Sequence, residues 1–142
     1  MKPFLLDVNV LVALFWRPHI HHQVASDWLR QHRNVGVRTC PITQAGFVRV
    51  TSNPRYSADR MTVAEAQVAL NSLLIQPEHE FWADDLQLSE AIELSGPIAG
   101  HQQITDAYLV ALAIKNGGRL ATFDRGALAL AGAKGIVELI TS

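Results

Sequence analysis

Cysteine and long apolar runs are almost missing from this chain, and each scarcity narrows the class of protein. Cys40 is the one cysteine among 142 residues, which excludes an intramolecular disulfide and makes a reducing cytoplasm the expected compartment. No apolar run is long enough to span a bilayer, and Asp7 interrupts the first one, so neither a membrane span nor a signal peptide is predicted. Because 49% of the residues are hydrophobic, we expect residues 1–142 to form one domain with a substantial core.

Net charge is nearly absent as well, and the value of −1 by itself indicates no nucleic-acid partner. The charges are unevenly distributed, however. Residues 1–60 contain eight Lys or Arg against three acids, whereas residues 61–142 contain four against ten. A local basic face in the first part of the chain is compatible with this distribution. Solvated side chains on helices and loops explain it equally well.

Apolar segments with strand-like and helix-like patterns alternate along the chain. The clearest helix runs to Lys115; Thr105 is expected to cap its start and Asn116-Gly117-Gly118 to end it. Strands are predicted before Asp7 and at residues 34–39, 80–83, 119–123 and 135–140, and further helices at 8–16, 24–32, 41–50, 62–74 and 88–94. This alternation predicts an α/β fold, a three-layer α/β/α sandwich with a mainly parallel central sheet.

Three aspartates stand at the ends of these predicted elements. Asp7 follows the first strand, Asp124 follows the strand RLATF, and Asp106 lies in the first turn of the late helix. Ligand sites in open parallel sheets form at the carboxyl ends of the strands. Three carboxylates that meet there without a basic partner repel one another, and a hard divalent cation such as Mg²⁺ relieves the repulsion. The sequence therefore predicts a metal site formed by Asp7, Asp106 and Asp124.

Each of these aspartates also has a purely structural interpretation. Asp7 is placed to cap the helix that follows it, Asp106 is a favourable first-turn acid, and Asp124 is placed to start a turn. Each structural role is individually commoner than metal binding, but the joint location of the three acids near one sheet edge favours the site. The three histidines within residues 19–22 lack a partner at a fixed spacing, and we interpret them as surface residues.

The order of three short motifs resembles a known family. Asp7-Val8-Asn9 follows the first strand, DAYLVALA begins at Asp106, and the motif TFD of residues 122–124 ends the next strand. This order, over nearly the whole chain, resembles that of the PIN-domain ribonucleases, specifically the VapC toxins of toxin–antitoxin pairs. The resemblance implies an endoribonuclease that cleaves RNA phosphodiester bonds and depends on Mg²⁺ or Mn²⁺. It also implies a cytoplasmic homodimer, neutralised by a VapB-like antitoxin, that binds promoter DNA only through the antitoxin.

Site residues follow from the same resemblance, position by position. The catalytic and metal-binding positions match Asp7, Asp106 and Asp124, and the supporting polar positions match Asn9 and Thr122. In this scheme Asp7 and Asp106 hold the metal, with Asp124 bound directly or through water, and the metal polarises the scissile phosphate and positions an attacking water. Basic side chains hold the RNA backbone, and Arg17, Arg49 and Arg125 are our candidates for that role.

The chain departs from the family pattern at Gly46, where the third helix usually carries a Glu. No acid lies between Asp27 and Asp59, so no neighbour in that helix replaces it. Glycine within a helix costs about 1 kcal/mol relative to alanine, so Gly46 requires a packing or access reason. The site then either works with three carboxylates and water, recruits Gln44 or His101, or has lost catalytic power.

Two other functions compete with the nuclease. One is a PIN-like protein that only binds a partner, with Gly46 as the sign of lost catalysis. The other is a phosphatase of the haloacid-dehalogenase type, which also begins with a strand followed by Asp. That class needs a second Asp two residues later, where this chain has Asn9, so we rank it low.

Overall fold

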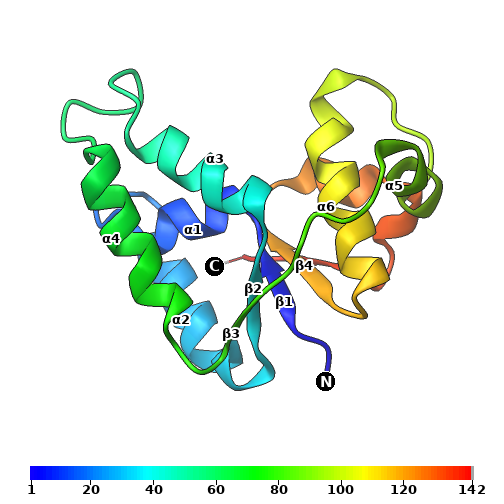
Figure 1. The fold of residues 1–142 in the computed structure, drawn as a ribbon, viewed down its shortest axis with the longest axis horizontal. Helices are drawn as coiled ribbons and strands as arrows, with labels where there is room; N and C mark the ends of the chain where they lie inside the picture. Colours follow the sequence, from blue (N-terminus) through cyan, green and yellow to red (C-terminus); the bar gives the residue numbers. More distant parts are fainter. Residues whose placement is uncertain (142) are drawn as a thin grey trace.

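Five parallel strands form one sheet, in the order β3-β2-β1-β4-β5, in the computed structural model, which describes residues 1–141 (Figure 1). The strands are β1 (Phe4–Leu6), β2 (Val37–Thr39), β3 (His79–Phe81), β4 (Arg119–Thr122) and β5 (Val137–Leu139). The two central strands, β1 and β4, are in register, with Leu5 opposite Leu120 and Leu6 opposite Ala121. The predicted parallel α/β architecture is confirmed. Because every pair is parallel, all carboxyl ends lie at the same edge of the sheet.

Helices cover both faces of this sheet. Figure 1 shows four helices on one side, α1 (Val8–Phe15), α2 (His22–His32), α3 (Pro41–Thr51) and α4 (Val63–Leu74), and two on the other, α5 (Leu88–Ser95) and α6 (Ile104–Lys115). Strand β1 contributes to both layers, because successive side chains of a strand point to opposite faces. Phe4 and Leu6 pack in the cluster beneath α1 and α2, whereas Leu5 packs against α6, and all three are fully buried. None of the described helices is long and apolar enough to cross a membrane.

Local capping signals explain most helix boundaries. Thr62 and Glu65 form the reciprocal capping box predicted for α4, and Gly117 ends α6 with a positive φ of 69°. The predicted cap at Thr105 is wrong. A 3-10 turn at His101–Gln103 runs directly into α6, so that Gln103 occupies the cap position and Thr105 lies inside the first turn. Asp106 is in the first turn, as predicted.

Strand boundaries are shorter than the apolar patterns suggested. The strand predicted at residues 34–39 begins only at Val37, because Arg33–Val35 form a 3-10 turn and Gly36 takes a φ of 104°. The last strand likewise begins at Val137, since Gly135 takes a φ of 74°. In each case a glycine in the left-handed region turns the chain into the strand.

Helix α3 packs closely on the start of α1, and Gly46 is the reason it can do so. Gly46 is buried, and a Cβ atom at this position would lie 2.5 Å from Cγ2 of Val8. That distance is far below a van der Waals contact between two carbons, so any side chain here would force Val8 or α3 to shift. Either close packing or access to the site was expected to explain this glycine, and the structure shows that close packing explains it.

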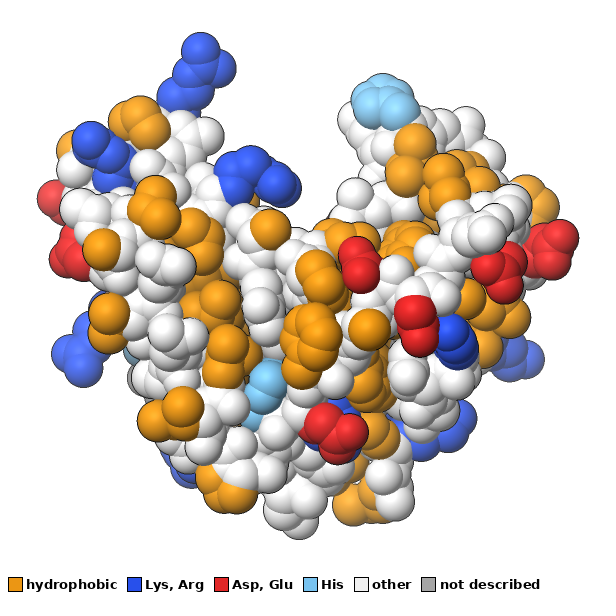
Figure 2. All heavy atoms as spheres, in the orientation of Figure 1, with side chains coloured by type: hydrophobic (Ala, Val, Ile, Leu, Met, Phe, Trp, Pro, Cys, Tyr) orange, Lys and Arg blue, Asp and Glu red, His pale blue; other side chains and the backbone are white. Residues whose placement is uncertain are grey.

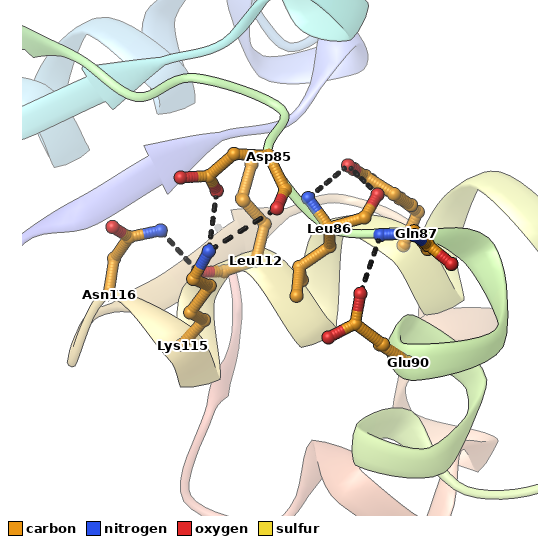
Figure 3. A network of polar contacts seen from close by, with 8 residues as sticks. Asp85, Leu86, Gln87, Glu90, Leu112, Lys115 and Asn116 are labelled. Atoms are coloured by element: carbon orange, nitrogen blue, oxygen red, sulfur yellow. Dashed lines mark hydrogen bonds and ion pairs between the residues drawn. The ribbon is translucent and has the colours of Figure 1, made fainter.

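The segment between β3 and α5 is fastened to α6 by polar contacts (Figure 3). Tyr108 donates a hydrogen bond from its hydroxyl to the carbonyl of Leu86 at 2.8 Å, and Lys115 forms an ion pair with Asp85 at 2.8 Å. The pair of Asp85 and Lys115 appears on one side of Figure 3, and the cap formed by Gln87 appears on the other. These contacts hold α5 against α6 and fix the helix whose first turn carries Asp106.

Candidate active site

The three aspartates come from two neighbouring strands and one helix start. Asp7 directly follows β1, and Asp124 follows β4 by one further residue, Phe123. Since β1 and β4 are adjacent and parallel, their carboxyl ends bring Asp7 and Asp124 to one edge of the sheet. Asp106, in the first turn of α6, is close enough to both for its ionisation to be affected by their charges. The structure thus brings together the three acids singled out in the sequence.

Asp7 is held in place by a network that links β1 to β4. Thr122 donates a hydrogen bond from Oγ1 to Oδ2 of Asp7 at 2.7 Å, and its oxygen accepts from Nδ2 of Asn9 at 3.2 Å and from the backbone N–H of Asp124 at 3.0 Å. Asn9 in turn accepts from the N–H of Phe123 at 3.2 Å. A buried hydroxyl with all its hydrogen-bonding capacity used is a rigid support. Asn9 and Thr122 therefore orient Asp7 and couple the backbone at Asp124 to it.

Asp7 also has the structural role considered for it. Its Oδ1 accepts the N–H of Val8 at 2.7 Å, and the residue occupies the cap position of α1. The side chain is only 7% exposed. Capping and metal binding are compatible, because a carboxylate oxygen has two lone pairs. The cap therefore fixes the direction of the carboxylate without using up its acceptor capacity.

Asp7 and Asp106 lie in surroundings that oppose their ionisation. Burial raises the pKa of Asp106, and the neighbouring charges of Asp7 and Asp124, with a hydrogen bond to Asp124, raise it further, to about 7. The pKa of Asp7 is also raised, chiefly by burial, although its bonds to Thr122 and Val8 act in the opposite direction. Within residues 1–141, no Lys or Arg forms an ion pair with any of the three. A cluster of acids with raised pKa values and no basic partner is suited to bind a cation.

Oxygen donors of this kind suit a hard divalent cation. Among the residues that the structure describes, no three His, Cys, Asp or Glu side chains converge closely enough to form a preassembled metal site. The three aspartates nevertheless fit such an ion by chemistry, because they are all oxygen donors whose mutual repulsion it would relieve. Val8 fills the space beside Gly46, so α3 contributes no acid from that position. Of the two substitutes considered, Gln44 donates its amide to Thr39 at 2.9 Å, whereas His101 lines a cavity with the acids.

Two hollows open on either side of Asp106. One, of about 580 Å³, is lined by Asp106 and Asp124 with His101, Gln102 and Gly126. The other, of about 440 Å³, lies between α3 and the start of α6 and is lined by Val8, Ala45, Arg49 and Thr105. Figure 2 shows the surface hollowed into a cleft between the part of the molecule that carries α3 and the part that carries the start of α6. Asp106 and Asp124 are thus reachable from solvent, whereas Asp7 lines neither hollow and is buried.

In the described part of the chain, the three arginines proposed to hold RNA form no ion pair with the acids, and one of them lines the cleft. Arg49 lines the hollow on α3, and Arg125 directly follows Asp124; both are exposed. Arg17 is exposed in the loop after α1. A feature that sequence reasoning missed lies beside Arg125, where the ring of His21 stacks on Phe123 at 4.8 Å between centroids. The cluster of histidines at residues 19–22 was the only signal of it in the sequence.

Comparison with known families identifies the class of protein. The model of the PIN domain matches residues 4–133, which is nearly the whole chain. The chain therefore belongs to the PIN-domain family. Within that family it falls among proteins named VapC: it is 44% identical to ribonuclease VapC38 of Mycobacterium tuberculosis over 140 residues, covering 96% of this chain and 97% of the relative. It is also 42% identical to ribonuclease VapC39 of the same organism, with 96% and 98% covered.

Solved structures confirm the fold. VapC20 of Mycobacterium tuberculosis, described as a sarcin–ricin loop cleaving toxin, superposes with a TM-score of 0.65 at 16% identity and covers 91% of this chain and 97% of its own. VapBC2 from Rickettsia felis, bound to a DNA fragment from its promoter, gives a TM-score of 0.64 at 16% identity, with 98% and 99% covered. The likeness at this identity concerns the fold, which is the three-layer arrangement described above.

Proposed function

We propose that the protein is a metal-dependent endoribonuclease, the toxin of a toxin–antitoxin pair, that hydrolyses RNA phosphodiester bonds with Mg²⁺ or Mn²⁺. The observation that carries this proposal is the cluster of Asp7, Asp106 and Asp124. The three carboxylates lie at the carboxyl edge of the sheet without a cationic partner among the described residues, and burial, together with the charges of Asp7 and Asp124, raises the pKa of Asp106 to about 7. The relatives named ribonuclease, at 42–44% identity over the whole chain, support RNA as the substrate.

Each residue of the cluster has a definite task in this proposal. Asp7, Asp106 and Asp124 hold the ion, and the ion, when bound, supplies the positive charge that polarises the scissile phosphate. Thr122 and Asn9 keep the Asp7 carboxylate in one orientation through the bonds at 2.7 Å and 3.2 Å. The half-buried Asp106, whose ionisation is costly, gains most from the cation. These carboxylates hold the positive charge of the ion where it would stabilise the negative charge that develops on the leaving oxygen.

We further propose a homodimer and a VapB-like antitoxin as partners, with promoter DNA bound only through that antitoxin, in the cytoplasm. The complex of VapBC2 with promoter DNA from Rickettsia felis supports the choice of partner, since its VapC chain has the same fold. Exposed apolar side chains on α4 and at its C-cap, namely Val63, Val68 and Ile75, are available for such contacts.

A second function, binding of a partner without catalysis, is favoured by one observation. Val8 occupies the space that a side chain at position 46 would need, so the acid that the family usually carries on α3 has no room here. If the remaining three acids are insufficient, the protein keeps the fold and loses the chemistry. The phosphatase alternative falls away, because the family match is to the PIN domain and Asn9 is committed to Thr122 and Phe123.

The test uses antitoxin-free protein with a mixture of transfer and ribosomal RNAs. We expect discrete cuts with Mg²⁺ or Mn²⁺ and none with EDTA. Asp7→Asn should reduce cleavage to the EDTA level while leaving the thermal unfolding transition in place, whereas Asp59→Asn, on an exposed loop, should cleave normally. Absence of both cleavage and saturable Mn²⁺ binding in calorimetry would support the partner-binding alternative, and equal activity of Asp7→Asn and the wild type would refute the site.

A further inference from the structure

The three histidines at the start of α2 make different contacts, and the contacts of His19 and His22 position the ring of His21. Nδ1 of His19 accepts the backbone N–H of His21 at 3.0 Å, and a ring nitrogen of His22 donates to the carbonyl of Ala13 at 2.8 Å. These two bonds tie the loop to itself and to α1. The ring of His21 is thereby laid on Phe123, with 4.8 Å between centroids and 13° between ring planes. His21 is exposed, whereas Phe123 is half-buried and packs against the core beneath α1 and α2.

This stack borders a cavity of about 300 Å³ that contains an exposed cation. The cavity is lined by His21, Phe123 and Arg125. Its other lining residues are Val24 of α2, Leu139 at the end of β5, and the following Ile140 and Thr141. Within residues 1–141, Arg125 forms no ion pair. The cavity thus combines a stacked aromatic pair, an unneutralised guanidinium group and apolar walls. It is chemically unlike the acidic hollow beside Asp106.

The cavity is nevertheless adjacent to the acids in the chain. Asp124 separates Phe123 from Arg125, so one short turn, held by the bond from the N–H of Gly126 to Oδ1 of Asp124 at 2.8 Å, belongs to both places. Asp124 and Gly126 line the acidic hollow, whereas Phe123 and Arg125 line this cavity. The same turn of the chain therefore joins the acidic hollow to this cavity.

We propose that this cavity binds an unpaired nucleotide of the RNA, next to the scissile phosphate. The ring of His21, backed by Phe123, supports the flat face of the base, and Arg125 neutralises a phosphate of the same strand. Aromatic rings that stack single-stranded bases beside a cation that follows the backbone are the usual elements of such binding. The base must be unpaired because a base within a duplex already has neighbours on both faces. This inference rests on the proposed ribonuclease function.

A merely structural role for His21, as a cover over the apolar ring of Phe123, is the competing explanation. The two roles differ in their response to the base. If His21 only covers Phe123, its removal lowers the stability of the protein and changes the cleavage of all RNA substrates to the same extent. If it stacks on a base, the effect of its removal disappears when that base is absent from the substrate.

The test is a cycle between protein and substrate. A short single-stranded RNA spanning one mapped cut is prepared with a single abasic position, placed in turn at each nucleotide around the cut. We expect one abasic position to lower kcat/KM of the wild type about fivefold or more, mainly through KM. His21→Ala should cause a similar loss with the intact RNA and little further loss with that abasic RNA, and His21→Phe should restore the stack. Arg125→Ala should raise KM and weaken its salt dependence, whereas Arg30→Ala, an exposed arginine paired with Asp27, should do neither.

Binding without cleavage separates the two levels of the argument. Fluorescence anisotropy of the labelled RNA in EDTA measures the subsite even if no cut is made, and the same histidine and arginine variants are compared there. Wild-type cleavage abolished by Asp7→Asn, together with unchanged KM and unchanged binding in His21→Ala, overturns the subsite and leaves the nuclease intact. Weakened RNA binding in His21→Ala together with no metal-dependent cleavage retains the subsite and refutes the proposed activity. If the loss caused by His21→Ala and the loss caused by the abasic RNA simply add, the subsite is also overturned.

Discussion

The side chain of Val8 fills the space that a side chain at position 46 would need: the Cγ2 atom of Val8 lies 2.5 Å from the position that a Cβ atom of residue 46 would take. Val8 is the residue after the buried carboxylate of Asp7, and Gly46 lies in the middle of α3. The two positions therefore cannot be changed independently. A larger residue on α3 requires a smaller one on α1.

The first prediction follows from this contact. Gly46→Ala should lower the free energy of unfolding by about 1–3 kcal/mol, because overpacking against the stiff side chain of Val8 outweighs the helix propensity of alanine. In a Val8→Ala background the same substitution should become neutral or stabilising. Urea denaturation of the four proteins measures this reversal of sign, and a Gly46→Ala effect that is the same in both backgrounds would contradict it.

The second prediction concerns the hydroxyl that supports Asp7. Thr122→Val keeps the shape but removes the 2.7 Å bond to Asp7 and the acceptor for Asn9 and for the backbone of Asp124. We expect a loss of about 1–3 kcal/mol in stability and roughly 10–100-fold weaker Mn²⁺ binding, as for other supporting partners of metal ligands. Thr122→Ser, which retains the hydroxyl, should lose much less. Calorimetry with Mn²⁺ and urea denaturation provide the two measurements.

The third prediction is a pH dependence of the metal-free protein. The pKa of Asp106 rises from 3.8 to about 7 on folding, so the folded state binds more protons than the unfolded state between these values. Its contribution to stability therefore falls as the pH increases from about 4 to 7, and the full penalty is present above 7. Asp106→Asn should stabilise the metal-free protein at pH 8, on the order of 1–2 kcal/mol after solvent screening, and have little effect near pH 4.

Divalent metal should reverse this dependence. Because the ion competes with the proton at Asp106, Mn²⁺ affinity is expected to rise as the pH increases through 7. Thermal unfolding with and without Mn²⁺ at several pH values tests both statements in one series. The exposed control Asp59→Asn should follow the wild type throughout. An Asp106→Asn effect independent of pH would show that the carboxyl is not shifted as described.

The fourth prediction concerns the attachment of α5 to α6. Tyr108→Phe removes the donor to the Leu86 carbonyl at 2.8 Å and should cost about 1 kcal/mol. Lys115→Met breaks the more exposed pair with Asp85 and should cost less, within about 0.5 kcal/mol. Neither residue lines the cleft, so kcat/KM on RNA should remain near the wild-type value in both variants. Parallel stability and cleavage measurements check the two expectations.

The sequence was most informative where short-range rules determine the outcome. Alternating apolar segments predicted the parallel sheet, the residues Thr62 and Glu65 predicted the start of α4, and glycine predicted the end of α6. The positions of Asp7 and Asp124 at one edge also followed, because parallel strands place their carboxyl ends together. Each of these rests on a few neighbouring residues or on a general property of sheets.

Contacts between distant parts of the chain could not be predicted from the sequence. The stack of His21 on Phe123 joins residues about a hundred positions apart, and nothing in either local pattern specifies the other. The fit of Val8 against Gly46 likewise depends on how α1 and α3 cross. The cap at Thr105 was wrong for a local reason, since the preceding 3-10 turn moves the helix start by about two residues.

The bond between Thr122 and Asp7 spans 115 positions along the chain. During synthesis, Asp7 leaves the ribosome long before the strand that completes its surroundings is made. A nascent chain that ends before β4 carries Asp7 and Asp106 without the hydroxyl that orients the first acid and without the third acid. The order of the strands therefore delays the assembly of the acidic site until β4 has been made.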